Sequence, residues 1–220
     1  MIKNLDEISD GKRYGLNDMV RASCNDCAGC SSCCEDMGDS IILDPLDIYE
    51  LTANLACSFE DLLKKEIGLT VADGMILPNL KMTEENVCPF LNQEKRCSIH
   101  GFRPGICRVF PLGRIYEDDH LDYFLQLDGC VKENRSKVKV SKWLDTPELK
   151  RNQKYLIDWH AFRKKIEGIL LEMEDENQKK TISMFLLNTF FVNPYDGKMD
   201  FYEQFYERLE EAKKLLSLGV

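Results

Sequence analysis

Five cysteines lie within eleven residues near the start of the chain, where the sequence from Cys24 to Cys34 reads C-N-D-C-A-G-C-S-S-C-C. A hydrophobic core uses cysteine singly, as a small buried side chain. Runs of C-x-x-C instead form short turns that direct several thiolates toward one point. The run therefore predicts ligands for a metal ion or an iron–sulfur cluster; disulfides or unused thiols are the alternative.

A second group of cysteines lies between residues 88 and 130 and is embedded in short motifs. Cys88 opens C-P-F-L, Cys97 opens C-S-I-H, and Cys107 lies within R-P-G-I-C-R-V-F-P. Cys130 is the last cysteine in the chain. Because the prolines of these motifs restrict the backbone, we expect this segment to form a stiff ligand loop.

These two segments together resemble the C-x-x-C-x-x-C-C cysteine-cluster family, which is described as a zinc- or iron-chelating domain and includes the flagellin lysine N-methylases. The likeness extends from about Cys27 to Cys130, and one departure is His100, where the family usually has tyrosine. Cys24 and Cys57 lie outside the likeness. The resemblance implies eight metal ligands, which are Cys27, Cys30, Cys33, Cys34, Cys88, Cys97, Cys107 and Cys130.

Iron–sulfur and zinc are both compatible with these thiolates. Four thiolates complete one tetrahedral zinc site or one [4Fe–4S] cube, so eight allow one centre with spare cysteines or two centres. Neighbouring side chains diverge in a strand or a helix, so Cys33 and Cys34 can bind one zinc only where the backbone is bent. The dense run and the resemblance to the methylases favour a [4Fe–4S] cluster, with zinc as the alternative. The resemblance also implies S-adenosylmethionine as a further cofactor.

Two arginines flank Cys107 and are the predicted cofactor-binding residues. The positive charges of Arg103 and Arg108 would offset the negative charge of metal-bound thiolates, and their guanidinium groups would donate hydrogen bonds to sulfur. Solvated surface arginines are the alternative. His100 lies close to Cys97 in the sequence and is a candidate substitute ligand.

The function predicted from these residues is metal binding, and whether the chain is an enzyme stays open. The resemblance implies a lysine N-methylase-like activity on a basic protein such as flagellin, with catalytic residues that the sequence does not identify. No G-x-S-x-G, H-E-x-x-H or P-loop motif is present, and no glycine-rich loop follows a strand. The alternative is a non-catalytic zinc- or iron-chelating module, or a structural cluster that supports protein interaction.

Composition and charge restrict the class of protein further. The 220 residues are 44% hydrophobic and 30% charged, with a formal net charge of −9. Such an acidic chain is unsuited to binding nucleic acid through phosphate contacts. We expect no signal peptide and no membrane span, because the longest apolar stretch, residues 182–192, falls short of about 20 residues. The prediction is a cytoplasmic protein with reduced thiols; its oligomeric state is not determined by the sequence.

The elements that must position the cysteines indicate an α+β fold. Residues 1–140 are expected to form an irregular cysteine-rich metal- or cluster-binding region with short strands, and residues 141–220 a mainly helical region packed on it. Asp44 and Ser58 are predicted N-caps, the first followed by proline. The expected elements of the first region are a strand at 41–43, helices at about 45–56 and 59–68, an extended segment at 71–82, and a hairpin with strands 112–116 and 121–127.

The second region begins where the cysteines end. Thr146-Pro147 repeats the pattern of an N-cap followed by proline. Apolar residues then recur at helical spacing from Tyr155 to Met173 and again from Tyr202 to Leu216. A more buried helix is expected at residues 181–192. The aromatic and leucine residues of these helices are expected to form core rather than a cofactor site.

Overall fold

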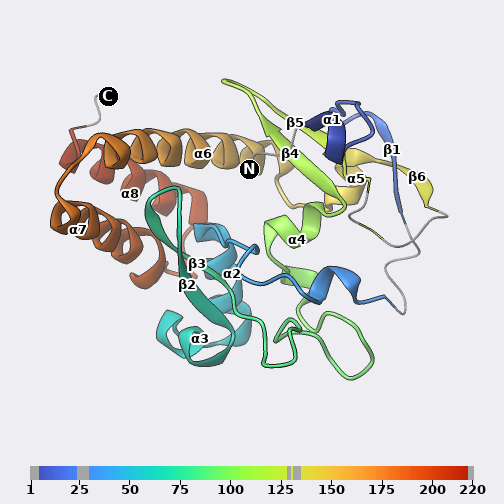
Figure 1. Ribbon diagram of the computed structural model, residues 1–220, viewed down its shortest axis with the longest axis horizontal. Coiled ribbons are helices and arrows are strands. Elements are labelled where there is room, and N and C mark those ends of the chain that lie inside the picture. The colour runs from blue at the N-terminus through green and yellow to red at the C-terminus, as the bar shows by residue number, and fades with distance from the viewer. Residues whose placement is uncertain (1–4, 24–29, 128–129, 131–134, 218–220) are drawn as a thin grey trace.

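The computed structural model describes residues 5–23, 30–127, 130 and 135–217 of the chain (Figure 1). Its helices are α1 (Leu5–Ile8), α2 (Pro45–Leu55), α3 (Phe59–Lys65), α4 (Gly105–Val109), α5 (Val140–Leu144), α6 (Leu149–Glu172), α7 (Glu176–Leu187) and α8 (Phe201–Leu215). Short turns of 3-10 helix, η1 (Ser32–Cys34) and η2 (His100–Phe102), and one π-helical turn, η3 (Asn188–Val192), complete the helical part. The strands are β1 (Met19–Ser23), β2 (Ile67–Ala72), β3 (Met75–Leu80), β4 (Leu112–Tyr116), β5 (Leu121–Leu125) and β6 (Ser136–Lys139). The fold is α+β, as the sequence predicts.

Two helices begin at the residues that the sequence indicates. Asp44 caps α2 by accepting a hydrogen bond from the backbone N–H of Asp47, whose own carboxylate accepts the N–H of Asp44. Ser58 and Asp61 make the same reciprocal capping box at α3. Such caps depend on residues only three apart, so they follow directly from local sequence.

Three antiparallel strand pairs replace any large sheet in the described residues: β1 with β6, β2 with β3, and β4 with β5. The β4–β5 hairpin confirms the sequence prediction. The predicted extended segment at 71–82 instead contains a chain reversal, because Asp73 and Gly74 both have positive φ (53° and 74°) and close a two-residue hairpin turn. Strand β2 begins at Ile67, so α3 ends before the predicted residue 68.

The expected strand at residues 41–43 does not form as a regular element. Ile42 makes a single bridge to Asn79, and the backbone N–H of Leu43 donates to the carbonyl oxygen of Pro78 at 2.9 Å. Leu80 N–H donates to the carbonyl oxygen of Ile41 at 3.0 Å. The segment therefore lies beside β3 and leads directly into the cap of α2.

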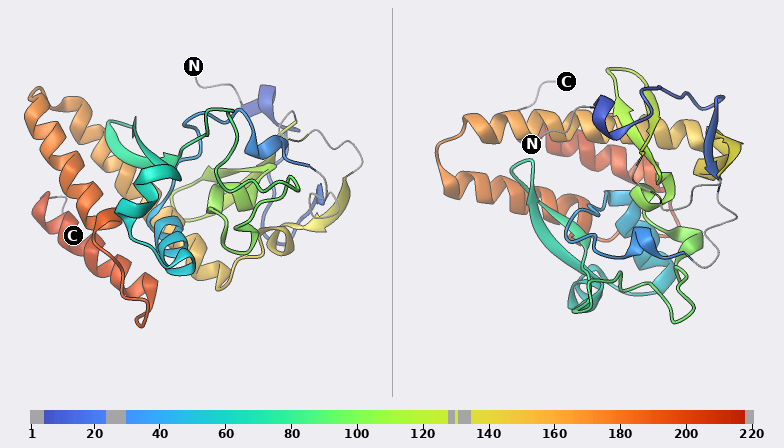
Figure 2. Two further views of the ribbon diagram at one scale, coloured as in Figure 1. Left: turned by 90° about the horizontal axis from the view of Figure 1, so that it is seen from below. Right: turned by 45° about the vertical axis from the view of Figure 1, so that its right-hand side comes forward.

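The long helices α6, α7 and α8 gather on one side of the molecule, with the β2–β3 hairpin against them (Figures 1 and 2). Their core contains the aromatic side chains that the sequence assigns to it. Trp159 lies with its ring centroid 5.0 Å from that of Phe190, and Tyr155 lies 4.6 Å from Phe205. The Ser183 hydroxyl donates to the carbonyl oxygen of Gly74 at 3.3 Å, which ties α7 to the hairpin.

Two predicted helix starts in this part are wrong. Thr146 does not cap α6, because its hydroxyl donates to the carbonyl oxygen of Leu144, and the helix begins only at Leu149 after Glu148 at φ 47°. Helix α7 begins at Glu176 rather than 181, capped by Asp175. The last helix, α8, is capped by Asp200 and confirms its prediction. Across the described residues, none of the helices has the length and apolar character needed to cross a bilayer.

Candidate metal centre

A cavity of about 410 Å³ gathers cysteines from both cysteine segments, and we call it the sulfur-lined cavity. Its cysteines come from three segments: η1 with the residues before it, the irregular loop between β3 and α4, and α4 itself. The cysteines that line it are Cys30, Cys33, Cys34, Cys88, Cys97 and Cys107. Residues more than fifty positions apart in the sequence thus share one chamber.

Backbone hydrogen bonds hold the two cysteine segments side by side. The N–H of Cys88 donates to the carbonyl oxygen of Cys34 at 2.7 Å. Glu35 bridges Val87 in antiparallel fashion, and the N–H of Asp36 donates to the carbonyl oxygen of Asn86 at 2.8 Å. Backbone hydrogen bonds of the polypeptide therefore hold the two segments together.

The adjacent cysteines 33 and 34 both face this cavity. The 3-10 turn η1 bends the backbone there, and the two sulfur atoms lie 4.0 Å apart. Neighbouring side chains diverge in a regular strand or helix, so the turn supplies the bend that the sequence analysis required. The thiol of Cys34 also hydrogen-bonds to Cys88, which places it between two other sulfurs.

The shared hydrogen bonds separate the proton affinities of these three thiols. The hydrogen bond from Cys34 lowers the pKa of Cys33 to about 7, with a further contribution from the charge of Arg103. A hydrogen bond from Cys34 lowers the pKa of Cys88 to about 7 in the same way, but the single S–H of Cys34 can donate to only one of these two sulfurs at a time. In return, those hydrogen bonds raise the pKa of Cys34. Because the thiolate is the metal-binding form, whichever of Cys33 and Cys88 accepts the hydrogen bond from Cys34 is available as a ligand near neutral pH.

The other two thiols from the second segment are held in their neutral form. Burial raises the pKa of Cys97, and it raises that of Cys107 more strongly. A buried thiol deprotonates when a metal cation takes the place of its proton. We therefore expect Cys97 and Cys107 to lose their protons when they bind a metal ion, and to stay protonated otherwise.

The two flanking arginines have different surroundings. Arg103 lines the sulfur-lined cavity, and its Nη1 lies 2.8 Å from Nε2 of His100, which lines the same cavity. Its Nε is enclosed and has no hydrogen-bond partner among the described residues, so its influence on the sulfurs is through charge. Arg108 instead donates to the carbonyl oxygens of Gly101 and Asp145, each at 3.0 Å. The predicted bond from Arg108 to sulfur is absent from the hydrogen bonds of the described residues.

The remaining predicted ligands lie elsewhere or outside the described residues. Cys130 does not line the cavity, and Cys57, which the resemblance left out, is a half-buried free thiol apart from it. The predictions for Cys24 and Cys27 fall outside the described residues. All eight cysteines in the described part are free thiols.

The donor set suits a thiophilic metal, but the sulfurs are not drawn together around one point. Thiolates select zinc, copper(I) or iron–sulfur centres over hard cations. Among the described residues, no group of three or more cysteine, histidine or acidic side chains is already spaced to hold one metal ion. Binding therefore requires thiols that line the cavity to rotate inward.

A second cavity, of about 390 Å³, adjoins the first and was not predicted from the sequence; we call it the polar cavity. Arg103 and Arg114 line both cavities. Asp44 and Asp47, read from the sequence only as a helix start, lie in its wall. An acidic first turn is normally solvated, so no local signal distinguishes these two carboxylates from ordinary capping residues.

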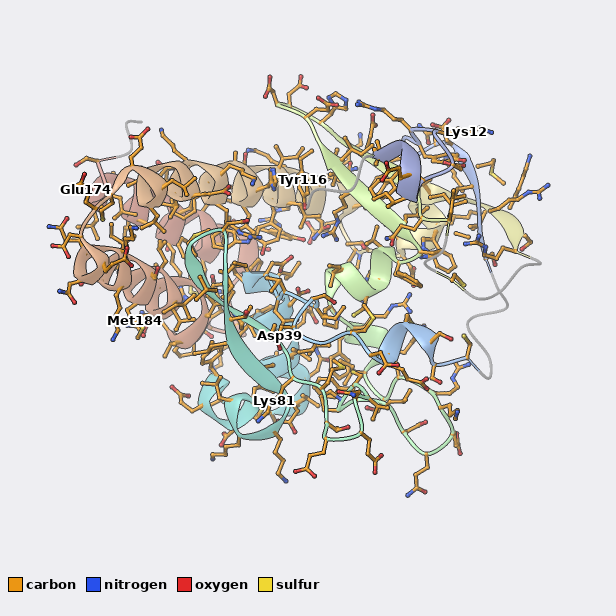
Figure 3. All side chains as sticks on the ribbon, in the orientation of Figure 1. Lys12, Asp39, Lys81, Tyr116, Glu174 and Met184 are labelled. Atoms are coloured by element: carbon orange, nitrogen blue, oxygen red, sulfur yellow. The ribbon has the colours of Figure 1, made fainter. Side chains whose placement is uncertain are left out.

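One aromatic contact connects the sulfur-lined cavity to the helical part. Tyr116, labelled in Figure 3, lies at the end of β4 and lines the cavity. Its ring stacks on that of His160 of α6, with ring centroids 3.9 Å apart. Burial lowers the pKa of His160, which favours the neutral ring. His160 therefore packs against the end of β4.

Comparison with known proteins is consistent with this geometry. No curated protein and no solved structure matches the chain. Residues 26–139, which include all six cysteines of the sulfur-lined cavity, match the family CxxCxxCC, described as "Putative zinc- or iron-chelating domain". The match supports a metal-binding role for the cysteine cluster. The chain belongs to this CxxCxxCC family.

Proposed function

We propose that the chain binds an iron–sulfur cluster of the [4Fe–4S] type through thiolates of the sulfur-lined cavity, with zinc as the alternative metal. One observation carries this proposal: six cysteines from two distant segments line a single chamber. The hydrogen bond from Cys34 lowers the pKa of Cys33 or of Cys88, whichever accepts it, to about 7. Thiolates that form at neutral pH are the form that either metal requires.

The arrangement of the sulfurs favours the cluster over zinc. A structural zinc site closes with four ligands around one ion, whereas a cube presents metal corners that are farther apart. The thiols are spread over the walls of the cavity rather than focused on one point, which suits the more widely separated corners of a cube. The nearby charge of Arg103 would offset the negative charge of a thiolate-bound cluster.

The test is metal and acid-labile sulfide analysis of anaerobically purified protein, joined to an absorption spectrum. We expect brown protein with iron and sulfide, and lower cluster content in Cys33→Ser and in Cys34→Ser. Cys57→Ser is the matched control, because Cys57 is a free thiol that does not line the cavity. Colourless protein with stoichiometric zinc after iron-replete anaerobic expression would overturn the cluster. Full occupancy in both cavity variants would remove the pair from the ligands.

Methylation of a lysine in a basic protein such as flagellin is the more specific activity that we propose, by resemblance to the flagellin lysine N-methylases. The sulfur-lined cavity supports it, because part of its wall is apolar and suits the alkyl chain of a lysine. Those walls include Met37, Ile41, Leu80, Met82, Leu91 and Ile99. S-adenosylmethionine would be the methyl donor.

Incubation with labelled S-adenosylmethionine and basic proteins, under anaerobic conditions, tests this activity. Transfer of label to lysine supports the methylase, with the Cys33→Ser and Cys34→Ser variants as controls that lack the full ligand set. Absence of donor binding and of labelled lysine favours a non-catalytic metal-binding module. A reducing compartment such as the cytoplasm suits either outcome, because it keeps the ligand thiols free.

A further inference from the structure

Strand β4 has a free edge on the side away from β5. Its hairpin partner, β5, is covered in turn by the N-terminal segment, and α1 lies on the β5 side of the hairpin (Figure 1). Tyr14 and Tyr123 exchange two backbone hydrogen bonds there, of 2.8 and 2.9 Å. Among the described residues, no segment pairs with the other side of β4. This edge is therefore open to a further strand.

The hydrogen-bond pattern shows which backbone groups point to the free edge. Tyr123 uses its N–H and C=O on Tyr14, so Arg114, which lies opposite Tyr123 in the hairpin, belongs to a non-hydrogen-bonded pair. The same alternation applies to Tyr116, two residues farther along β4. The N–H and C=O groups of Arg114 and Tyr116 therefore point away from β5, and none of them bonds to a backbone group in the described part of the chain.

The sulfur-lined cavity borders this strand. Its lining includes Gly113, which has no side chain, so the cavity reaches the main chain of β4. The side chains of Leu112, Arg114 and Tyr116 share one face of the hairpin, because strand residues two apart point the same way, and all three line the cavity. A chain paired with β4 would therefore direct every second side chain to the face on which the cysteines lie.

The turn at the end of this edge is acidic. It follows β4 directly and carries Glu117, Asp118 and Asp119, the last two of which are exposed. Within the described ranges, Arg13 is the one basic side chain from outside the hairpin that forms a salt bridge with this turn, through Glu117. Negative charge is thus in excess here, which favours basic residues in a chain that approaches β4.

We propose that β4 binds an extended segment of a basic protein as an additional strand, with one side chain of that segment inside the sulfur-lined cavity. This inference deepens the proposed methylase activity and rests on it for the identity of that side chain as lysine. Backbone hydrogen bonds to Arg114 and Tyr116 supply affinity that is independent of sequence. The cavity selects one side chain, and the acidic turn selects basic neighbours. The substrate lysine must then lie in extended or unfolded chain, not within a helix.

Fluorescence polarisation with labelled peptides tests strand addition on the purified full-length protein, without S-adenosylmethionine. The parent peptide has a central lysine, alternating threonine and valine around it, and an arginine at each end. Two further peptides carry N-methyl groups on alternate amides, each on a different set. Only every second N–H of a strand faces its neighbour. We therefore expect one N-methylated peptide to bind at least about tenfold more weakly than the parent, and the other to bind within about twofold of it.

Three outcomes of this titration would overturn the proposal. They are no measurable binding of the parent peptide, equal affinity of all three peptides, and equal loss of affinity in both N-methylated peptides. Sedimentation velocity adds a fourth, since a dimer that dissociates in Tyr116→Pro would show that a second copy of the chain occupies the edge.

Two variants at one position locate the peptide on β4. Tyr116→Ala and Tyr116→Pro both remove the ring, but only proline also removes the N–H that points to the free edge, where edge strands tolerate it. We expect Tyr116→Pro to bind the parent peptide at least about fivefold more weakly than Tyr116→Ala. Equal affinity of the two variants would show that the peptide does not pair with β4.

A matched pair of double variants tests the charge of the partner. Asp118→Asn with Asp119→Asn removes two charges from the acidic turn. Glu172→Gln with Glu174→Gln removes two from exposed positions at the far end of α6, where Figure 3 labels Glu174. We expect the turn variant to bind the parent peptide about threefold more weakly and the α6 variant to bind it as wild type does. Equal affinity in both would overturn the preference for a basic partner.

A transfer assay with labelled S-adenosylmethionine and the same three peptides separates this inference from the proposed function. A peptide set that shows the alternating pattern of affinity but never receives label would defeat the methylase alone. Label transferred to all three peptides at equal rates, at concentrations below saturation, would defeat the strand pairing alone. Metal content, measured on the same samples, reports on the cluster separately from both.

Discussion

The backbone N–H of Gly105 donates a 2.7 Å hydrogen bond to Oδ1 of Asp47, a residue 58 positions away in the sequence. Gly105 opens α4, the helix that carries Cys107, and Asp47 belongs to the first turn of α2. A Cβ at position 105 would meet Nη2 of Arg114 at 3.1 Å, so only glycine allows this close approach without movement of the arginine. The contact thus joins the wall of the polar cavity to a cysteine-bearing helix.

The carboxyl group of Asp47 makes stability fall as pH rises. Burial, and then the charge of Asp44, raises the pKa of Asp47 from its ordinary 3.8 to about 8. The folded state therefore binds this proton more tightly than the unfolded state, and the free energy of unfolding decreases between these two values. Urea unfolding across that range should show a shallower decrease for Asp47→Asn than for wild type. Identical slopes would contradict the prediction.

Asp61 is the matched control, since it occupies the same capping-box position in α3 and has the opposite shift. The hydrogen bond from Lys64 lowers the pKa of Asp61 to about 2. Its contribution to stability is present above the unfolded value and is lost as pH falls toward the folded value. Asp61→Asn should therefore leave the decrease in the free energy of unfolding between pH values of about 4 and 8 unchanged.

Replacing Arg103 should reduce the reactivity of Cys33 in metal-free protein. The charge of Arg103 contributes to the lowered pKa of that thiol, and iodoacetamide reacts with the thiolate. Arg103→Gln should slow alkylation of Cys33 a few-fold near neutral pH, measured by mass spectrometry of the labelled peptide. Arg108→Gln should leave the rate unchanged, because Arg108 does not line the sulfur-lined cavity. Equal slowing in both variants would show that general unfolding, not local charge, is responsible.

Removing the hydroxyl of Tyr155 should weaken the attachment of α6 to α2. This buried hydroxyl donates to Asp44 and accepts the backbone N–H of Leu46 at 3.1 Å. Tyr155→Phe leaves that N–H without its partner, which costs about 1–3 kcal/mol of the free energy of unfolding. Tyr206→Phe, which removes a bond to the half-exposed Asp158, should cost less in the same denaturation measurement. A larger loss for Tyr206→Phe would refute this ranking.

The ring of Phe124 lies so close to position 113 that only glycine leaves room for it. Gly113 pairs with Phe124 across the β4–β5 hairpin, and a Cβ there would collide with the Phe124 ring. Gly113→Ala should lower the free energy of unfolding by about 1–3 kcal/mol. Gly168→Ala, in the exposed middle of α6 with nothing within 4 Å of the added Cβ, should instead raise it by about 0.5–1 kcal/mol. Thermal unfolding shifts of the same sign for both would contradict the explanation.

Features set by neighbouring residues were the ones that the sequence could predict. The caps at Asp44 and Ser58, and the β4–β5 hairpin, each depend on contacts within a few residues. The predicted N-cap at Thr146 is wrong, because a threonine hydroxyl can donate a hydrogen bond as readily as it can accept one. Here the hydroxyl donates to the carbonyl oxygen of Leu144. The boundary at about residue 140 between the two regions stays a prediction.

Other features needed information that lies far away in the chain. Strands β1 and β6 are more than a hundred residues apart, and no local pattern pairs Val20 with Val138. The turn at Asp73-Gly74 did carry a signal, because aspartate followed by glycine between apolar residues is typical of a hairpin. For the cysteines, spacing identified the candidates, while their distribution around one cavity, and the absence of Cys130 from its walls, depended on tertiary structure.

The backbone hydrogen bonds between the two cysteine segments bear on what happens to the sulfur-lined cavity when metal is removed. The N–H of Cys88 is bonded to the carbonyl oxygen of Cys34, and Glu35 is bridged to Val87. The long connection between the segments is therefore closed by the polypeptide, and an arriving ion does not have to offset the loop-closure entropy. Small zinc domains fold only as they take up their ion. Because backbone hydrogen bonds join the two segments here, we expect them to stay paired after metal is removed and the protein to take up metal again without refolding.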